Sequence, residues 1–177
     1  MDQALALESA LVDHEARFEQ LFGQYHGSIH AYLCRLVGDR KQAEDLTQDA
    51  FVKAYRALPR LPQEANARAW LYRIATNTAL DWLRRRALVS WLPLFDRDHH
   101  PAVQATFVDR SLESVAVQQA LKRLPPRYRV PLVLYACQGL STQEIAEILH
   151  ISRGAVKTRL FRSREKFRRI YMPEEVT

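Results

Sequence analysis

A basic segment near the carboxyl end carries the side chains best suited to binding phosphate. Between Arg153 and Arg169 there are eight Lys or Arg residues and a single acid. On a helical wheel the apolar residues of this segment gather on one face, which leaves the opposite face for a partner. Cations and hydroxyls beside an aromatic ring can contact DNA phosphates and base edges, so the segment predicts DNA binding. The candidate contacts are Arg153, Lys157, Thr158, Phe161 and Arg162.

A capping signature precedes this segment. Ser141 is followed three residues later by Glu144, so each side chain can cap the other's backbone amide. Ser152 offers a second N-cap oxygen. A short helix over 142–149 before a basic helix over 153–170 is typical of a helix-turn-helix that enters the major groove. A solvated basic helix on an ordinary helical hairpin is the alternative on this pattern alone.

A second candidate nucleic-acid face lies on a helix predicted over 66–86. Arg73, Asn77 and Arg84 align on one side of it, with Trp70 beside them. Arginine pairs with phosphate, an amide reads a base edge and an indole stacks on an unpaired base. In the alternative interpretation, the indole completes the core and the amide is simply solvated.

The chain is predicted to be all-α, with two small helical bundles joined by a flexible linker and a helix-turn-helix in the C-terminal bundle. No alternating strand pattern is present, and Gly and Pro fall mostly between periodic segments. The stretch 87–110 has no clear periodicity, and its roughly 24 residues reach at most about 80 Å when extended. Helices are expected over 13–37, 41–58, 66–86, 111–123, 126–137, 142–149 and 153–170.

The helix over 41–58 carries apolar residues in two sectors. Such a helix is either central to its bundle or docks on a partner, and both interpretations stay open. Its neighbouring acids favour a basic partner. One sector holds Phe51, Tyr55 and Leu58; the other holds Leu46, Ala50 and Ala57, beside Asp45, Gln48 and Asp49.

Composition argues for an intracellular nucleic-acid-binding protein without enzymatic activity. The net charge of +6 favours a nucleic-acid partner. The two cysteines are far apart in the sequence and do not indicate a disulfide framework, which fits a reducing, cytoplasmic setting. No signal peptide or membrane-spanning run is evident. His26 and His30 have helical zinc-ligand spacing but lack further ligands, so no metal, cofactor or catalytic residue is expected.

Several motifs resemble the extracytoplasmic-function (ECF) sigma factors. The segment 45–56, Asp-Leu-Thr-Gln-Asp-Ala-Phe-Val-Lys-Ala-Tyr-Arg, resembles their core-binding segment, and 70–77, Trp-Leu-Tyr-Arg-Ile-Ala-Thr-Asn, their promoter-melting segment. Leu-Pro-Pro-Arg-Tyr-Arg at 124–129 and the stretch 139–146 resemble sigma region 4. The resemblance covers about 15–86 and 111–170.

The resemblance implies a dissociable initiation subunit of bacterial RNA polymerase. It implies a region 2-like domain over 1–88, a linker over 89–110 and a region 4-like domain over 111–177. Asp45, Gln48 and Asp49 would face the clamp helices of the largest polymerase subunit, which would make their neighbouring apolar sector a partner surface. Core polymerase, including the flap of its second-largest subunit, promoter DNA and an anti-sigma factor are the implied partners.

The resemblance also assigns promoter contacts. The loop from Pro59 to Asn66 would hold a base flipped from the minus-ten element, and the following helix would hold the melted strand. For this downstream element the implied residues are Leu61, Asn66, Trp70, Arg73, Asn77 and Arg84. For the upstream, minus-thirty-five element they are Thr142, Gln143 and the five contacts named above.

The chain departs from the family in two places. Its loop lacks the Phe-Arg-Gly often found there and has two prolines, and its linker contains the apolar run 91–95. Three interpretations of this run stay open. It is a partly ordered linker that covers its own domain, it binds a regulator, or it accompanies closure of the two modules on each other in the free chain. Two other classes remain: a dimeric operator-binding regulator, and an adaptor whose first module binds only protein.

Overall fold

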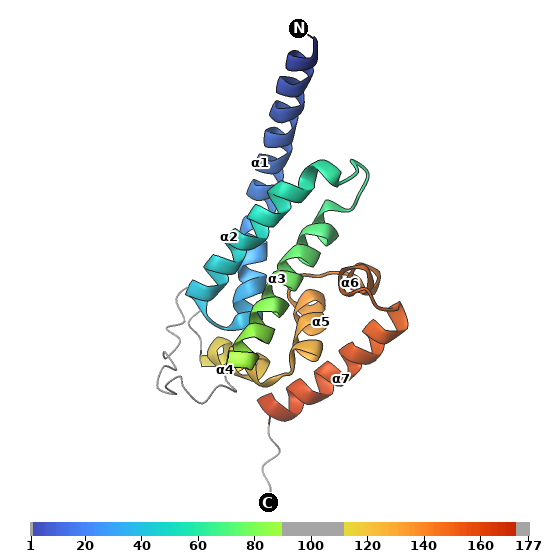
Figure 1. Ribbon diagram of the computed structural model, residues 1–177. Coiled ribbons are helices and arrows are strands. Elements are labelled where there is room, and N and C mark those ends of the chain that lie inside the picture. Colours follow the sequence, from blue (N-terminus) through green and yellow to red (C-terminus); the bar gives the residue numbers. More distant parts are fainter. Residues whose placement is uncertain (1, 90–111, 173–177) are drawn as a thin grey trace, which may run out of the picture.

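The computed structural model describes residues 2–89 and 112–172, with side chains at 12–88 and 114–172. Within these stretches all regular structure is helical, which confirms the predicted all-α class (Figure 1). None of these helices has both the length and the hydropathy that crossing a membrane requires. The elements are α1 (Asp2–Val37), α2 (Arg40–Ala57), the 3-10 turn η1 (Leu58–Arg60), α3 (Ala67–Val89), α4 (Leu112–Arg123), α5 (Pro126–Ala136), α6 (Thr142–Leu149) and α7 (Arg153–Tyr171).

Helix α1 is longer than predicted. It begins at Asp2 rather than at residue 13, so the predicted start is wrong. Residues 2–12 contain neither Gly nor Pro and are rich in Ala and Leu, which favour helix. This first part of α1 projects beyond the other helices (Figure 1).

The turn between α1 and α2 is made by a glycine and a capping aspartate. Gly38 has φ +72°, in the left-handed region, and its amide donates to the Cys34 carbonyl over 2.8 Å. The Asp39 carboxylate then accepts from the Gln42 amide at 3.0 Å and starts α2. These local signals reverse the chain so that α2 packs along α1.

Helices α1, α2 and α3 form the first bundle. Tyr32 on α1 and Tyr72 on α3 meet edge to face, with ring centroids 5.3 Å apart. The Tyr32 hydroxyl is 2.8 Å from Thr76 Oγ1, so its polar end is satisfied inside the core. Burial raises the pKa of this phenol well above its usual range.

Helices α4 to α7 form the second bundle, with a buried arginine at its base. Pro126 opens α5 at a position where a missing amide hydrogen has no consequence. One turn later, Arg129 is only 6% exposed. Its guanidinium donates to the Leu124 carbonyl at 2.9 Å and to the Lys122 carbonyl at 2.6 Å. It therefore ties the end of α4 to the start of α5.

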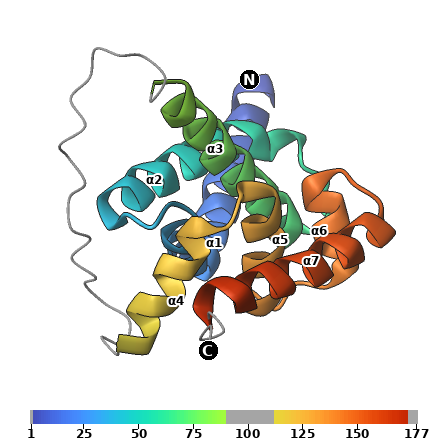
Figure 2. The ribbon, with the colours of Figure 1, turned by 90° about the horizontal axis from the view of Figure 1, so that it is seen from below.

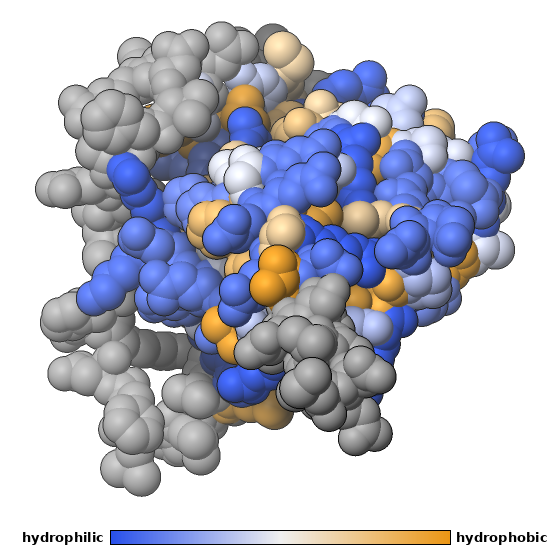
Figure 3. Space-filling view, turned by 90° about the horizontal axis from the view of Figure 1, so that it is seen from above, coloured by the Kyte–Doolittle hydropathy of each residue, from blue (hydrophilic) through white to orange (hydrophobic). Residues whose placement is uncertain are grey.

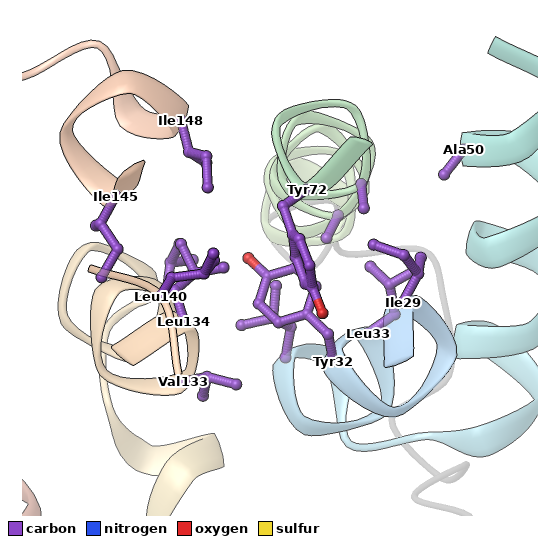
Figure 4. Packing of buried hydrophobic residues seen from close by; sticks show 14 of the residues in the cluster. Ile29, Tyr32, Leu33, Ala50, Tyr72, Val133, Leu134, Leu140, Ile145 and Ile148 are labelled. Atoms are coloured by element: carbon purple, nitrogen blue, oxygen red, sulfur yellow. The ribbon is translucent and has the colours of Figure 1, made fainter. Parts of the chain in front are cut away.

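The two bundles pack against each other around a continuous core. Figure 2 shows α5 between α1 and α7, and Figure 4 shows Tyr32 and Tyr72 between side chains of the two bundles. Ile145 and Leu134 of the second bundle belong to the same buried cluster as Leu33 of the first. The closed arrangement suggested by the sequence is thus present. The linker run 91–95 that prompted the idea lies outside the described residues.

Gly38 also marks how closely the bundles approach. A Cβ at this position would lie 1.8 Å from Cε of Lys122 on α4. The positive φ is what requires glycine here, because the flexible Lys122 side chain can move aside for a Cβ.

Candidate nucleic-acid interface

The helix-turn-helix is built by the predicted caps. The Ser141 hydroxyl accepts from the Glu144 amide at 3.2 Å, and the Glu144 carboxylate accepts from the Ser141 amide at 2.8 Å. Burial by itself would raise the pKa of Glu144, but the hydrogen bonds from Ser141 outweigh it and lower the pKa below the usual value. His150 takes the left-handed conformation, φ 51°, and Ser152 caps α7 through the Ala155 amide at 3.1 Å.

The recognition face of α7 is open to solvent. Its inner face is anchored by Val156 and Leu160, which are 0% and 3% exposed. Buried Ser163 fixes the helix further, because its hydroxyl donates to the Tyr128 carbonyl at 2.8 Å. On the outer side, all five predicted α7 contacts are exposed: Arg153, Lys157, Thr158, Phe161 and Arg162. Their contacts with DNA stay predictions.

The start of α6 lies beside the start of α7. Arg153 Nε donates to the Thr142 hydroxyl at 3.2 Å, which links the two helices of the motif. Gln143 is exposed, and its amide donates to Glu147 at 3.0 Å. The structure therefore brings the upstream set together on one side of the second bundle. Phe161 is 66% exposed and is an apolar side chain among these polar groups.

The predicted face of α3 is only partly free. Asn77 and Arg84 are exposed and Arg73 is half-buried, whereas Trp70 packs partly against the core. Arg84 is held by Asp81 of the same helix, with Nη1 2.8 Å from the carboxylate. Trp70 therefore supports the core and keeps part of its surface exposed beside the face, and its stacking on a base stays a prediction.

Helix α2 adds a cation to the α3 face that the sequence analysis missed. Lys53 Nζ donates to the Thr78 hydroxyl at 3.0 Å, next to Asn77. The contact joins two helices across 25 residues of chain, so a wheel of either helix alone could not reveal it. Lys53 gives this face a positive charge within its first bundle.

The loop before α3 is shaped by prolines and a cap. Leu61 and Asn66 are its predicted contact residues, with Leu61 half-buried and Asn66 exposed. Asn66 Oδ1 accepts from the Ala69 amide at 3.0 Å, so this residue also caps α3. Within the loop, the Ala65 amide donates to the Pro62 carbonyl at 3.3 Å.

The two apolar sectors of α2 are mostly core, which corrects one expectation; Tyr55 is 38% exposed and Ala57 is half-buried. The exposed fractions of Leu46, Ala50 and Phe51 are 3%, 0% and 4%. The sector beside the acids is therefore not a partner surface, because α2 packs against α1 on one side and α3 on the other. The acids themselves form an exposed polar stripe: Asp45, Gln48 and Asp49.

Hydrogen bonds across the bundle interface run mainly from side chains to main-chain carbonyls. Gln118 Nε2 on α4 donates to the Arg35 carbonyl at 3.2 Å, at the end of α1. Arg129 of α5 donates to the Leu36 carbonyl beside it. At the other end, the Tyr72 hydroxyl donates to Gln138 Oε1 at 2.7 Å, and Arg68 donates to the Gln138 carbonyl.

The interface also touches the loop-proximal end of α3. Hydrogen bonding from the Asn66 side chain, together with the Arg68 charge, contributes to the low pKa of Glu144. Helix α6, the first helix of the helix-turn-helix, therefore lies against the predicted downstream-element residues, while the exposed face of α7 points away. From above, the molecular surface is mostly hydrophilic, with hydrophobic residues in separate patches (Figure 3).

The chain is similar to known transcription proteins over both bundles. The family model "Sigma-70 region 2" matches residues 21–89 and "Sigma-70, region 4" matches residues 114–167. RNA polymerase sigma factor SigZ of Bacillus subtilis is 34% identical over 152 residues, which cover 86% of this chain and 85% of SigZ. ECF RNA polymerase sigma factor SigW of the same organism is 34% identical over 163 residues, which cover 86% of this chain and 87% of SigW. Among solved structures, CnrH in complex with the cytosolic domain of CnrY matches with a TM-score of 0.65 and 31% identity over 94% of both chains.

Proposed function

Because the chain belongs to the ECF family of sigma-70 factors, which direct RNA polymerase to promoters, we propose that its two bundles read separate promoter elements. In this division α7 reads the upstream element, and the loop before α3 together with the α3 face captures the opened downstream element. The observation that carries the proposal is the exposed face of α7, set on an inner face locked by Val156, Leu160 and Ser163.

The upstream element is read as duplex. Arg162 and Lys157 supply phosphate or guanine contacts, and Phe161 supplies an apolar surface. The Arg153–Thr142 hydrogen bond holds the two helices of the motif in one register, so α6 contributes to the same surface. A rigid helix-turn-helix of this kind positions a protein on intact DNA without opening it.

The downstream element is captured as a single strand. A base that leaves the duplex has lost a few kcal/mol of stacking and pairing, which the protein must replace. The Leu61–Asn66 loop would receive the base, and Asn77 with the cations Arg73 and Lys53 would hold the strand beside it. Because unpaired strands bind here and duplexes do not fit, sequence selection couples to opening.

Polymerase binding is assigned to the exposed acids of α2. Asp45, Gln48 and Asp49 present a polar stripe to the basic clamp helices of the largest subunit, as complementary charge favours. The second bundle would dock on the flap of the second-largest subunit. An anti-sigma factor is a further proposed partner, and the similar CnrH, solved with the cytosolic domain of CnrY, supports a regulatory partner.

The proposed domain layout explains why the closed form must open. The domains are 1–88 and 111–177, joined by 89–110. Elements centred about 25 base pairs apart are separated by about 85 Å of DNA. A compact chain of 177 residues has a radius of gyration of only about 16 Å. The closed chain cannot reach both elements, so promoter recognition requires separation of the bundles on polymerase.

Transcription from fragmented genomic DNA by core RNA polymerase, with sequencing of RNA 5′ ends, tests this division. We expect new start sites that share two upstream motifs at a fixed spacing. Arg162→Ala should weaken binding to the upstream motif by about 1–3 kcal/mol and so reduce transcription from promoters that contain it. Arg164 is an exposed cation on the other side of α7, and Arg164→Ala should leave this binding unchanged. Asn77→Ala should instead reduce permanganate reactivity of the opened thymines. Equal loss of both motifs in either variant would contradict the division.

A further inference from the structure

The loop that precedes α3 is clamped by an arginine from α1. Arg17 Nη1 donates to the Leu61 carbonyl at 3.0 Å, and Arg17 Nη2 donates to the Pro62 carbonyl at 3.1 Å. One guanidinium thus holds two successive carbonyls, with 44 and 45 residues of chain between the partners. Arg17 lies before residue 21, where the match to the Sigma-70 region 2 model begins.

The loop has few hydrogen-bond donors of its own at this point. Pro59 and Pro62 have no amide hydrogen, so they cannot tie the loop to neighbouring carbonyls. Proline at position 62 also keeps Leu61 extended, at φ −83° and ψ 116°. The conformation therefore rests on proline geometry, on two backbone hydrogen bonds and on Arg17. The backbone bonds are those from the Leu61 amide to the Leu58 carbonyl at 3.0 Å and from the Ala65 amide to the Pro62 carbonyl at 3.3 Å.

Helix α1 presents Arg17 from a fixed position. Its neighbour Phe18 packs edge to face on Tyr55 and Phe51 of α2, with ring centroids 5.0 Å and 6.3 Å away. One turn earlier, His14 Nε2 lies 3.0 Å from the Tyr55 carbonyl. The aromatic contacts lock this part of α1 onto α2, so the guanidinium reaches the loop from a rigid support.

We propose that Arg17 is a positioning residue for base capture, holding the 59–66 loop in its receiving conformation before DNA arrives. The proposal rests on the proposed function of that loop. Arg17 uses its donors on loop carbonyls, so it acts through the loop conformation rather than as a base reader. A loop already ordered in the free protein loses less conformational freedom on binding, which strengthens capture of the correct base.

The test uses the full chain assembled with core RNA polymerase. Its DNA is a fluorescent single strand carrying the downstream motif found by start-site mapping, compared with the same strand in which the captured base is replaced. Arg17→Ala should weaken binding of the motif strand about tenfold, the effect of losing one or two charge-assisted hydrogen bonds. Binding of the replaced strand should change little, so discrimination falls. Arg17→Lys, which keeps one donor group, should recover part of it.

His14→Ala is the matched control. It removes the α1–α2 hydrogen bond and the ring contact with Tyr55 one turn away without touching the loop. Because Phe18 still holds α1 on α2, this variant should reduce discrimination much less than Arg17→Ala does. Core binding, upstream-duplex binding and thermal unfolding should be alike for all variants, because Arg17 is half-buried on a helix surface and truncation leaves carbonyls that water can reach.

Three results would overturn the proposal. If Arg17→Ala distinguishes the two strands as well as wild type does, the clamp is dispensable. An equal loss in His14→Ala would assign the effect to docking of α1 as a whole. If wild type itself does not distinguish the two strands, the loop does not capture a base, and the proposed function of the loop fails together with that of Arg17.

Discussion

Removing the Tyr72 hydroxyl should release the second bundle from the first. In Tyr72→Phe the ring remains in the core, but its 2.7 Å hydrogen bond to Gln138 Oε1 is lost across the interface. The hydroxyl also lies within hydrogen-bonding range of Ser28 in its own bundle. A double-mutant cycle with Gln138→Ala isolates the interface contribution from the local one.

The expected magnitude follows from one neutral hydrogen bond. A buried bond of this kind stabilises the state that contains it by about 1 kcal/mol. The ratio of open to closed molecules should therefore rise about fivefold in Tyr72→Phe. The coupling energy of the cycle should be close to the same 1 kcal/mol, because each single variant already removes the bond.

Single-molecule energy transfer measures this ratio. Dyes are attached to cysteines placed at exposed Lys41 on α2 and exposed Arg168 on α7, in a chain whose Cys34 and Cys137 are changed to Ser. The open fraction is followed over urea concentrations below the unfolding transition and extrapolated to water. Closed molecules give high transfer, and separation of the bundles lowers it.

Tyr32→Phe is the control for general loosening. It removes the hydrogen bond to Thr76, which has a similar 2.8 Å length but lies wholly inside the first bundle. This variant should lower the free energy of unfolding while leaving the open fraction as in wild type. The reasoning is refuted if Tyr72→Phe leaves the open fraction unchanged, or if the two tyrosine variants open the chain equally.

Three further predictions concern the cap, the polymerase stripe and the recognition helix. Ser141→Ala should lower the free energy of unfolding by about 1 kcal/mol at neutral pH, measured by urea denaturation. Because the folded-state pKa of Glu144 is lowered, its contribution is present above the unfolded-state pKa and is lost as pH falls through the folded-state pKa; an unfolding profile of Glu144→Gln parallel to wild type across the acidic range would contradict this. Asp49→Ala should weaken core-polymerase binding in a fluorescence titration without changing thermal unfolding, and unchanged binding would remove Asp49 from the polymerase contacts. Lys157→Ala should lower the salt dependence of upstream-duplex binding by about one ion, and an unchanged slope would remove Lys157 from the phosphate contacts.

The helix-turn-helix could be predicted because its determinants are local. The Ser141–Glu144 capping box joins residues three apart, and the buried stripe of α7 repeats with the helical period, so neither depends on the rest of the fold. The start of α1 was missed for the opposite reason. Residues 2–12 favour helix by propensity, but propensity is a weak signal, and no capping box marks a start at Asp2.

The composition and order of the motifs determined the family resemblance and the two helical modules, since both depend only on residue identity along the chain. Tertiary structure decided what each face is available for. Packing of α2 between two helices buries Leu46 and Ala50 and leaves its acids exposed. Likewise, the Arg17 clamp, the Lys53–Thr78 contact and the Tyr72–Gln138 bond join residues 25 to 66 positions apart. Such contacts depend on how whole helices are placed, and a pattern read within one helix contains no information about that placement.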